Sequence, residues 1–532
     1  MEDLDVIIVG AGANGLVCAI VLARAGLRVH VLEDRPAVGG GCRTEFPFAA
    51  APRLAASTGT HRLGFVPADL LRRVEVSLPL RPRDPCTFVP TETPGAFLLA
   101  GPGHAAFREA VGRSPHGGSA DAAALAAMHA ELDEIVADLG PAWIAGALDI
   151  EATAERFVRK ARREAFVALC RGSIGAYVDR FGVKSDLVRC AIASDALAST
   201  FGSWSSPGTG AALLVRHAAQ GLSGGADGIP EGGMGAVVRT LADLALHVGV
   251  TIATGKSATS IVVEGNSAAG VMLADGEVIR ATTVVSSADP ARLRAMIGDA
   301  HLPPDYQKRV DAFERVGSVA KVNLALSALP KFSALPDAHD QGQHRATIHL
   351  VPGAGHDGIA RLEASFAEAE KGRLPAAPPL ELVLPTATDP SLRDPEGRHH
   401  ASLLVPWAPY DLAGTTWAAE EERWLKGLLA VLDSFAPGTS SLVVDASVLS
   451  PKKLESHFGV TRGHVHHVDD SFIFGDRLAC TTPIGGLYAC GAGCAPAGGV
   501  FAVAGHNAAQ RVIADMELGL ERTEVSTNPF KR

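Results

Sequence analysis

The order of apolar and polar positions near the N-terminus predicts a strand, a helix and a second strand. A continuous apolar run, Val6–Val9, leads into the turn Gly10–Gly15, and a helical apolar stretch follows. A second apolar run begins at Leu27 and ends in an acid, Glu33. Short apolar runs on either side of a segment with helical period are typical of a βαβ unit with parallel strands.

Helical periodicity dominates the next part of the chain. Apolar residues at i, i+3 and i+4 predict amphipathic helices over 121–139, 154–170 and 185–197. We then expect a helix over Ala236–His247, strands over Thr251–Ala253, Ala258–Glu264, Ala268–Leu273 and Thr282–Val285, and a hairpin turn at Asp275-Gly276. Residues 320–450 are expected to be rich in strands, and residues 485–516 to form a strand, a glycine loop and a helix.

These patterns indicate more than one domain. A chain of 532 residues is too long for a single hydrophobic core. A βαβ unit at one end and a strand, glycine loop and helix at the other predict one α/β cofactor domain assembled from residues 1–75, 225–320 and 455–516. Residues 76–224 and 321–454 are expected to form a second, mixed α+β domain over the cofactor, and residues 517–532 a polar, frayed tail.

Composition excludes several classes of function. The formal net charge of −10 leaves no basic patch for nucleic acid. No apolar run is long enough for a transmembrane helix, and the acidic start Met-Glu-Asp-Leu-Asp is unlike a signal peptide, so we expect a cytoplasmic protein with at most peripheral membrane contact. The absence of H-E-x-x-H and P-loop motifs removes support for zinc proteases and phosphotransferases.

The first turn carries a dinucleotide-binding fingerprint. Gly10, Gly12 and Gly15 form G-x-G-x-x-G between a strand and a helix, and Glu33 ends the second strand about twenty residues later. Gly10 permits the tight turn, Gly12 lets the backbone approach a pyrophosphate, and Gly15 lets helix and strand pack closely. The helix N-terminus offers free N–H groups to phosphates, and Glu33 is placed to accept hydrogen bonds from a ribose. The sequence therefore predicts a bound dinucleotide.

A second literal match, Gly353–Gly358, is interpreted differently. Pro352 interrupts the entry from a strand, the following helix is heavily charged, and no acid ends a downstream strand, since Glu381 begins one. We interpret this segment as a surface loop, so that a separate nicotinamide site gains no support.

Glycines continue after the acid-ending strand. Gly39, Gly40 and Gly41 let the chain pass close to a cofactor, and Arg43 is placed to pair with a pyrophosphate. Disulfide reductases of similar fold carry a cysteine pair here, but Cys42 has no second cysteine within the next residues and is expected to be a packed thiol. The eight cysteines contain no C-x-x-C.

Two segments near the C-terminus leave alternatives open. The run from Gly485 to Val500 precedes a small-residue helix, and its amides suit either a flavin and its ribityl phosphate or a glycine-rich turn in a core. In Gly463–Asp470, strand alternation would place His464 and His466 on one face and His467 on the other, an incomplete metal set. We therefore expect no metal there, and one histidine is a candidate proton carrier near the cofactor.

With these segments in hand, the chain resembles the phytoene-desaturase-related flavoproteins over nearly its whole length. It is most similar to the branch called pyridine nucleotide-disulphide oxidoreductase domain-containing proteins, which also lacks the disulfide pair; carotenoid desaturases and isomerases are related. The resemblance is carried by Val9–Gly15 with Glu33, Gly39–Thr44, Pro230–Gly235, Val284, Ser286, Asp289 and Pro290, Asp389–Ser391, Trp407–Tyr410, and Gly491–Ala509.

The resemblance implies FAD in a glutathione-reductase-like Rossmann domain. It assigns the glycine turn to the pyrophosphate, Glu33 to the adenosine ribose, Ala258 to adenine, and Gly499 with Val500 to the flavin ring. The full set of cofactor-binding residues implied is Gly10, Gly12, Ala13, Asn14, Gly15, Glu33, Gly40, Gly41, Arg43, Ala258, Gly491, Ala492, Gly499 and Val500. His467 matches a family histidine and is the catalytic candidate. Two positions depart from the family: Ala492 replaces an acid and Ala495 a histidine.

The resulting prediction is an FAD-dependent oxidoreductase of the desaturase, dehydrogenase or oxidase type. It would remove hydride from a carbon of an apolar small molecule in a dry pocket, with oxygen or a quinone as electron acceptor. Carotenoid-like, fatty-acyl and amine substrates all remain open. The alternatives are a redox-neutral isomerase of a polyene and a non-catalytic flavin-bearing interaction protein.

Overall fold

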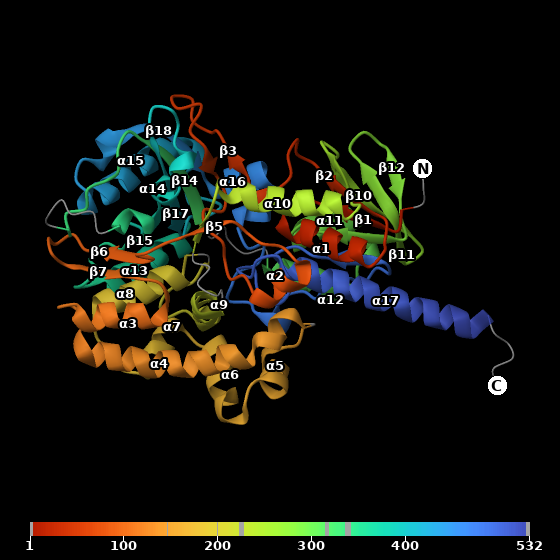
Figure 1. The fold of residues 1–532 in the computed structure, drawn as a ribbon, viewed down its shortest axis with the longest axis horizontal. Helices are drawn as coiled ribbons and strands as arrows, with labels where there is room; N and C mark the ends of the chain where they lie inside the picture. Colours follow the sequence, from red (N-terminus) through yellow and green to blue (C-terminus); the bar gives the residue numbers. More distant parts are fainter. Residues whose placement is uncertain are drawn as a thin grey trace.

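The fold is described from a computed structural model that covers residues 4–145, 147–198, 200–222, 228–313, 319–335 and 342–527. Two large sheets lie side by side, and a layer of helices packs below one of them (Figure 1). The predicted fold class, a Rossmann-like α/β domain with a second mixed domain, is confirmed. The exact domain boundaries stay a prediction, and the one at 224/225 lies outside the described residues.

The first sheet contains five parallel strands in the order β19-β13-β1-β2-β9. Its strands are β1 (Val6–Val9), β2 (Val29–Glu33), β9 (Thr251–Thr254), β13 (Thr283–Ser286) and β19 (Leu487–Ala489). Helices α1 (Ala13–Arg24), α10 (Met234–His247) and α17 (Val503–Thr527) lie on this sheet, and α10 and α17 both pack against α1 (Figure 1). Strand β19 comes from the far end of the chain and runs parallel to β1. The C-terminal glycine loop that follows β19 therefore lies at the same carboxyl end of the sheet as the fingerprint that follows β1.

A smaller antiparallel sheet covers the other side of this domain. It contains β10 (Ala258–Glu264), β11 (Ser267–Leu273) and β12 (Val278–Arg280), and the expected turn at Asp275-Gly276 joins the last two. Helix α11 (Pro290–Ile297) begins where Asp289 accepts the N–H of Arg292, with Pro290 in the first turn. Helix α12 (Pro304–Phe313) follows.

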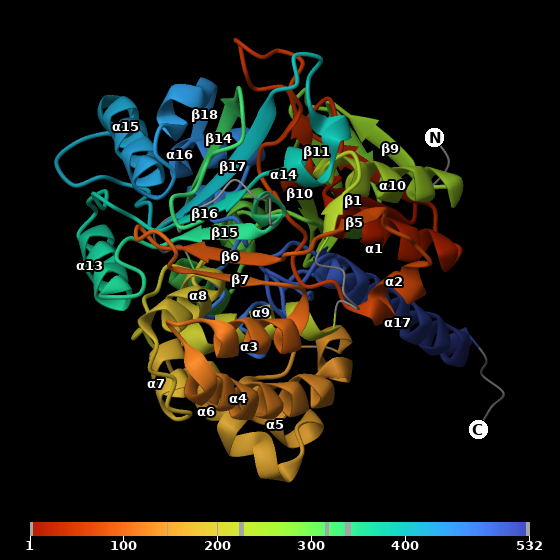
Figure 2. The ribbon, with the colours of Figure 1, turned by 60° about the vertical axis from the view of Figure 1, so that its left-hand side comes forward.

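The second sheet has seven strands in the order β18-β14-β17-β16-β15-β6-β7 (Figure 2). Its strands are β6 (Thr87–Pro90), β7 (Phe97–Ala100), β14 (Val319–Leu326), β15 (Thr347–Leu350), β16 (Leu380–Val383), β17 (His399–Pro406) and β18 (Val443–Leu449). All pairs are antiparallel except β15 with β6. Helix α15 (Trp417–Phe435) packs on one face through Trp424, Leu428 and Phe435. The sequence missed this helix and predicted mostly strands here.

Most of the remaining helices form the layer below the second sheet, and the others are short connections between strands. They are α2 (Ala68–Val74), α3 (Gly103–Arg113), α4 (Gly118–Asp138), α5 (Ile150–Phe157), α6 (Arg163–Arg171), α7 (Ile174–Asp179), α8 (Asp186–Ala196), α9 (Thr209–Leu222), α13 (Gly358–Glu370), α14 (Pro385–Thr388) and α16 (Pro451–Phe458). Short strand pairs join β3 (Thr44–Glu45) to β4 (Ala56–Ser57) and β5 (Leu80–Pro82) to β8 (Gly228–Pro230).

Two helix predictions need correction. The single helix expected over 154–170 is two helices, α5 and α6, because α5 ends at Phe157 and the backbone of the next residue, Val158, is extended. Helix α17 continues to Thr527, past the expected start of the tail, and residues 528–532 lie outside the described part. Within the described residues, no helix has the length and apolarity to cross a membrane.

Candidate active site

One large cavity, of about 650 Å³, runs between the two sheets. Thirteen of the fifteen residues that the sequence proposed for the site line it: Gly10, Gly12, Ala13, Asn14, Glu33, Gly40, Gly41, Arg43, Ala258, His467, Ala492, Gly499 and Val500. The other two lie behind its wall. A Cβ on Gly15 would lie 2.0 Å from the carbonyl oxygen of Gly10, and one on Gly491 would lie 2.7 Å from two backbone oxygens, so both glycines permit close backbone packing.

The N-terminus of α1 faces this cavity without a capping side chain. Gly12 is the N-cap residue, and a Cβ built on it would meet no protein atom within 4 Å. Gly10 has φ +96°, a conformation that favours glycine, at the tight turn before it. Uncapped N–H groups at a helix start attract phosphate, so the cradle fits a pyrophosphate at Gly12. Asn14 also lines the cavity, while its side-chain oxygen accepts the N–H of Gly505 on α17.

Glu33 is buried at the end of β2. Its carboxylate accepts the backbone N–H of Ala11 at 2.8 Å and that of Arg35 at 3.1 Å. Burial raises the pKa of this carboxyl to about 7, with a smaller effect from Asp34 beside it. The acid is thus fixed against the glycine turn, as a contact to the cofactor's ribose requires.

The segment Gly39–Arg43 passes over the same turn. The N–H of Gly39 donates to Ala11, and Gly40 adopts φ +53°. The Arg43 guanidinium lies 5.3 Å from the Phe458 ring and donates to the carbonyl of His457, while its buried Nε has no partner among the described residues. An unpaired buried donor beside the cavity fits an anionic group there.

Cys42 is half-buried: it packs against the core, as expected, and also lines the cavity. Burial raises the pKa of Cys42 to about 11, and none of the cysteines, all of them described, forms a disulfide. The thiol therefore stays protonated at neutral pH.

The C-terminal glycine loop pairs with a segment near the fingerprint. Phe65 donates to the carbonyl of Gly499 at 3.0 Å and accepts from Phe501 at 2.7 Å. A Cβ on Gly64 would lie 2.4 Å from the Gly499 oxygen, so the two chains touch backbone to backbone. This pairing places His61 and Arg62 within a few residues of the loop assigned to the flavin ring.

The prediction of a strand around His464–His467 is wrong. Gly463 and His467 adopt φ +69° and +62°, which turn the chain, so there is no alternation of faces. His466 bonds to Asp470 at 2.6 Å, and His464 lies 3.5 Å from Asp469. His467 is half-buried on the cavity wall, and desolvation lowers its pKa to about 4, so its imidazole is neutral at pH 7.

The fully buried Arg477 holds this loop in place. Its guanidinium donates to the carbonyls of His466 and Val468 and, at 2.9 Å, to that of Ala492. It therefore links the histidine loop to the position where this chain departs from the family acid.

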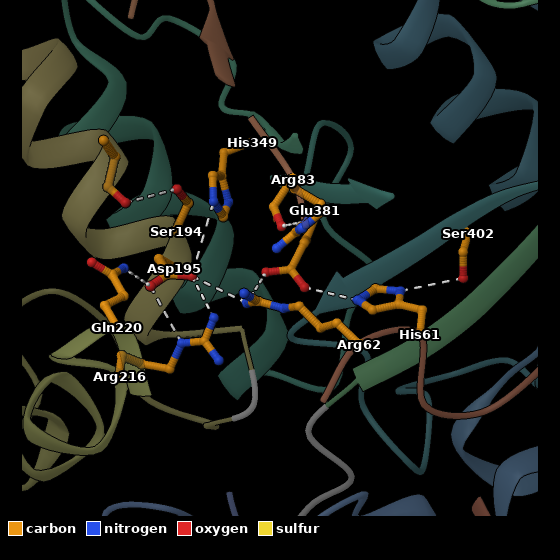
Figure 3. A network of polar contacts seen from close by, with 12 residues as sticks. His61, Arg62, Arg83, Ser194, Asp195, Arg216, Gln220, His349, Glu381 and Ser402 are labelled. Carbon is orange, nitrogen blue, oxygen red and sulfur yellow. Dashed lines mark hydrogen bonds and ion pairs between the residues drawn. The ribbon is translucent and has the colours of Figure 1, made fainter. Parts of the chain in front are cut away.

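Sequence reasoning missed the other end of the cavity, where charged side chains converge from distant segments (Figure 3). We call this the charged end: His61, Arg62, Asp195, Arg216, Lys321 and Glu381. Glu381 accepts from His61 at 2.9 Å and from Arg62 at 2.8 Å. Asp195 on α8 accepts from Arg62 at 3.1 Å and from Arg216 on α9 at 2.5 Å.

Lys321 lies in the middle of β14 and is 1% exposed. It contacts His61 Nδ1 and donates to Ser402 Oγ at 2.5 Å. Burial lowers the pKa of Lys321 to about 7, and burial together with Lys321 lowers that of His61 to about 4. A lysine within the apolar run Val319–Leu326 was the sequence signal for a buried, functional amine.

In the second glycine motif, Gly353–Gly358, a carboxylate of the protein binds the backbone N–H groups that a nucleotide phosphate would otherwise bind. The Asp186 carboxylate accepts N–H groups from Gly355, Gly358 and Ile359 at 2.9–3.2 Å, so it fills the N-terminus of α13. Residues 351–354 before it are buried rather than on the surface. These hydrogen bonds therefore join α8 to the start of α13. The finding agrees with the interpretation that the second glycine motif does not bind a nucleotide.

Comparisons with known proteins agree with this geometry. Residues 165–513 match the family described as flavin containing amine oxidoreductase, and residues 8–66 match an NAD(P)-binding Rossmann-like domain. Mouse pyridine nucleotide-disulfide oxidoreductase domain-containing protein 2 is 30% identical, over 97% of this chain and 94% of its own length. Carrot prolycopene isomerase is 27% identical over 55% of this chain and 45% of its own.

Solved structures share the fold. An oxidoreductase from Methanosarcina mazei has a TM-score of 0.60 at 18% identity, covering 96% of this chain and 100% of its own. Putrescine oxidase bound to putrescine has a TM-score of 0.58 at 17% identity, covering 97% and 99%. The resemblance seen in the sequence is confirmed.

Proposed function

We propose a function from the premise that this chain belongs to the family of flavin containing amine oxidoreductases and binds FAD. It is a dehydrogenase or oxidase that takes hydride from a carbon of its substrate and a proton from the neighbouring atom. The observation that carries this proposal is the buried amine of Lys321 in the same cavity as the dinucleotide fingerprint.

The residues present fit the cofactor. The uncapped start of α1 and the open space at Gly12 suit the pyrophosphate, and Glu33 suits the ribose. The unpaired Nε of Arg43 supplies a further donor beside the phosphates. When bound, FAD supplies the acceptor for the hydride.

The residues of the chain accept the substrate's proton. A neutral Lys321 that donates to Ser402 and to His61 Nδ1 keeps its lone pair for a substrate proton. His61 donates from Nε2 to Glu381, which fixes the tautomer that leaves Nδ1 as the acceptor. Loss of a hydride and a proton from adjacent atoms leaves a double bond, C=C or C=N, in the product.

The reacting part of the substrate is apolar. Ala198, Val215, Ala219 and Leu404 line the cavity among the charged groups and offer it a dry surface. Oxygen or a quinone takes the electrons in the second half of the reaction. We place the enzyme in the cytoplasm, without nucleic-acid partners and with at most peripheral membrane contact.

An anaerobic screen tests this function. Fatty acids, polyenes and amines are mixed with the FAD-bound protein under argon, and the visible flavin absorbance is followed. A substrate of the proposed class bleaches the flavin, and oxygen restores the colour. Conversion that requires prior reduction and consumes no electrons would instead indicate the isomerase, the alternative suggested by the prolycopene isomerase relatives. No bleaching and no conversion with any compound would contradict an enzyme of either kind.

A further inference from the structure

The carboxylates at the charged end are all engaged by protein cations. Glu381 is held by His61 and Arg62, and Asp195 by Arg62 and Arg216. A third lining carboxylate, Asp470, bonds to His466 at 2.6 Å and lies 3.5 Å from Arg477. In the described part of the chain, a cationic ligand group would thus find no unpaired carboxylate at this end, and burying an uncompensated ammonium is costly.

Two arginines already balance the carboxylates. Arg62 and Arg216 offset the charges of Asp195 and Glu381, so no carboxylate at this end is left for a cationic ligand even when Lys321 is neutral, as the proposed function requires. Arg216 donates to Asp195 from Nε at 3.3 Å and from one terminal nitrogen at 2.5 Å. Its other terminal nitrogen has no hydrogen-bond partner among the described residues, and its side chain, 19% exposed, lines the cavity. That nitrogen is available to an acceptor on a ligand.

Arg216 is also close to the reacting part of the cavity. It follows Val215 on α9, and a Cβ on Gly499 would lie 3.4 Å from Val215 Cγ1. Ala198, Val215, Ala219 and Leu404 line the same cavity as Arg216. An apolar chain and a negative charge therefore find matching surfaces within one cavity.

We propose that the substrate is an amphipathic anion, an apolar chain that carries a carboxylate, and that Arg216 binds this carboxylate. Arg216 offers a planar guanidinium already fixed by Asp195, the geometry that suits carboxylate recognition. The inference rests on the proposed function and narrows its substrate class. It distinguishes this chain from enzymes that bind a cationic amine.

Three probes of equal length test the charge preference. Hexanoate, hexanamide and hexylamine are titrated into the FAD-bound protein, and binding is read from the change in flavin absorbance. We expect hexanoate to bind at least about tenfold more tightly than hexanamide, since a hydrogen bond between two charged groups is stronger than one to a neutral amide. Hexylamine should bind most weakly. Equal binding of the three, or a preference for hexylamine, would overturn the proposal.

Arg216→Gln tests the residue. It should weaken hexanoate about tenfold or more and leave hexanamide unchanged, and Arg216→Lys should recover part of the loss. The same substitution at the exposed Arg423 on α15 is the matched control and should change nothing. Unaltered hexanoate binding by Arg216→Gln would refute the assignment. Protein without FAD would refute the proposed function instead, and calorimetry of the same three probes would still decide the anion site.

Discussion

The backbone N–H of Ala11 donates to Glu33 across 2.8 Å, which fastens the glycine turn to the end of β2. The carboxyl that receives this bond is buried, and its pKa is raised to about 7. Its ionisation therefore changes within the physiological range, and this has consequences for cofactor affinity.

Affinity for FAD should rise with pH. In the cofactor-free protein, Glu33 becomes ionised as pH passes about 7, and an ionised carboxylate is the stronger acceptor for ribose hydroxyls. We expect the dissociation constant, measured by fluorescence quenching, to fall between about pH 6 and 8. Glu33→Gln should bind more weakly and lose this pH dependence. A variant with the wild-type pH profile would show that another group titrates.

The same raised pKa should make the folded protein less stable as pH rises, although the same rise in pH makes FAD binding tighter. A carboxyl whose pKa is about 7 when folded, against 4.5 as its ordinary value, holds its proton more tightly in the folded state. The cofactor-free protein should therefore lose stability as pH rises from about 4.5 to about 7, and Glu33→Gln should reduce that slope in urea unfolding.

Gly12→Val should separate cofactor binding from folding. The valine meets no protein atom near its Cβ but projects into the cavity, so we expect a folded, colourless protein. Gly15→Ala is the contrasting variant, because its Cβ would lie 2.0 Å from a backbone oxygen and must destabilise the fold. Circular dichroism melting and FAD content measure the two effects. A fully yellow Gly12→Val protein would contradict the pyrophosphate assignment.

Lys321→Met should remove the proton acceptor. We expect the rate of flavin reduction to fall about 10²–10⁴-fold. In the wild type, kcat/KM should rise to a plateau above pH about 7, because the neutral amine is the active form. The variant should lack this rise, while Lys331→Met, an exposed lysine ten residues later, should keep it. An unchanged rate and pH profile in Lys321→Met would mean that another group takes the proton.

Asp186→Ala should destabilise the protein without affecting FAD. Three backbone N–H groups lose their acceptor, which should lower the free energy of unfolding by about 1–3 kcal/mol in urea. Asp357→Ala removes an exposed carboxylate from the same turn and should cost less. If the loop were a nucleotide site, NADH would raise the melting temperature of the wild type, and we expect no such shift.

Cys42→Ala should retain flavin reduction at the wild-type rate. Since the thiol has a pKa of about 11, it should also react slowly with iodoacetamide at about pH 8. Rapid alkylation of Cys42, or loss of reduction in the alanine variant, would indicate redox chemistry at this cysteine.

The cofactor end was predictable from the sequence because its signals are local. One turn, one helix start and one acid within about twenty-five residues specify the cradle, and β1, α1 and β2 lie where the apolar pattern places them. The helix α15 was also within reach, because Trp417, Trp424, Leu428, Val431 and Phe435 recur with helical spacing.

The charged end was not predictable, because no local pattern connects its members. Arg62, Asp195, Arg216 and Glu381 meet only after two helices and a strand of the second sheet have packed. The strand expected through His464–His467 is absent for another reason. Gly463 and His467 take positive φ, and Arg477 binds the carbonyls of His466 and Val468 on either side of His467, a contact that the sequence does not reveal.

The cofactor content of the purified protein tests the central claim most directly. The protein is denatured, and the released flavin is identified by mass and counted against chain concentration. The account predicts FAD at about one per chain, either as purified or after incubation with added FAD. A colourless protein that does not take up FAD under any of these conditions would contradict it.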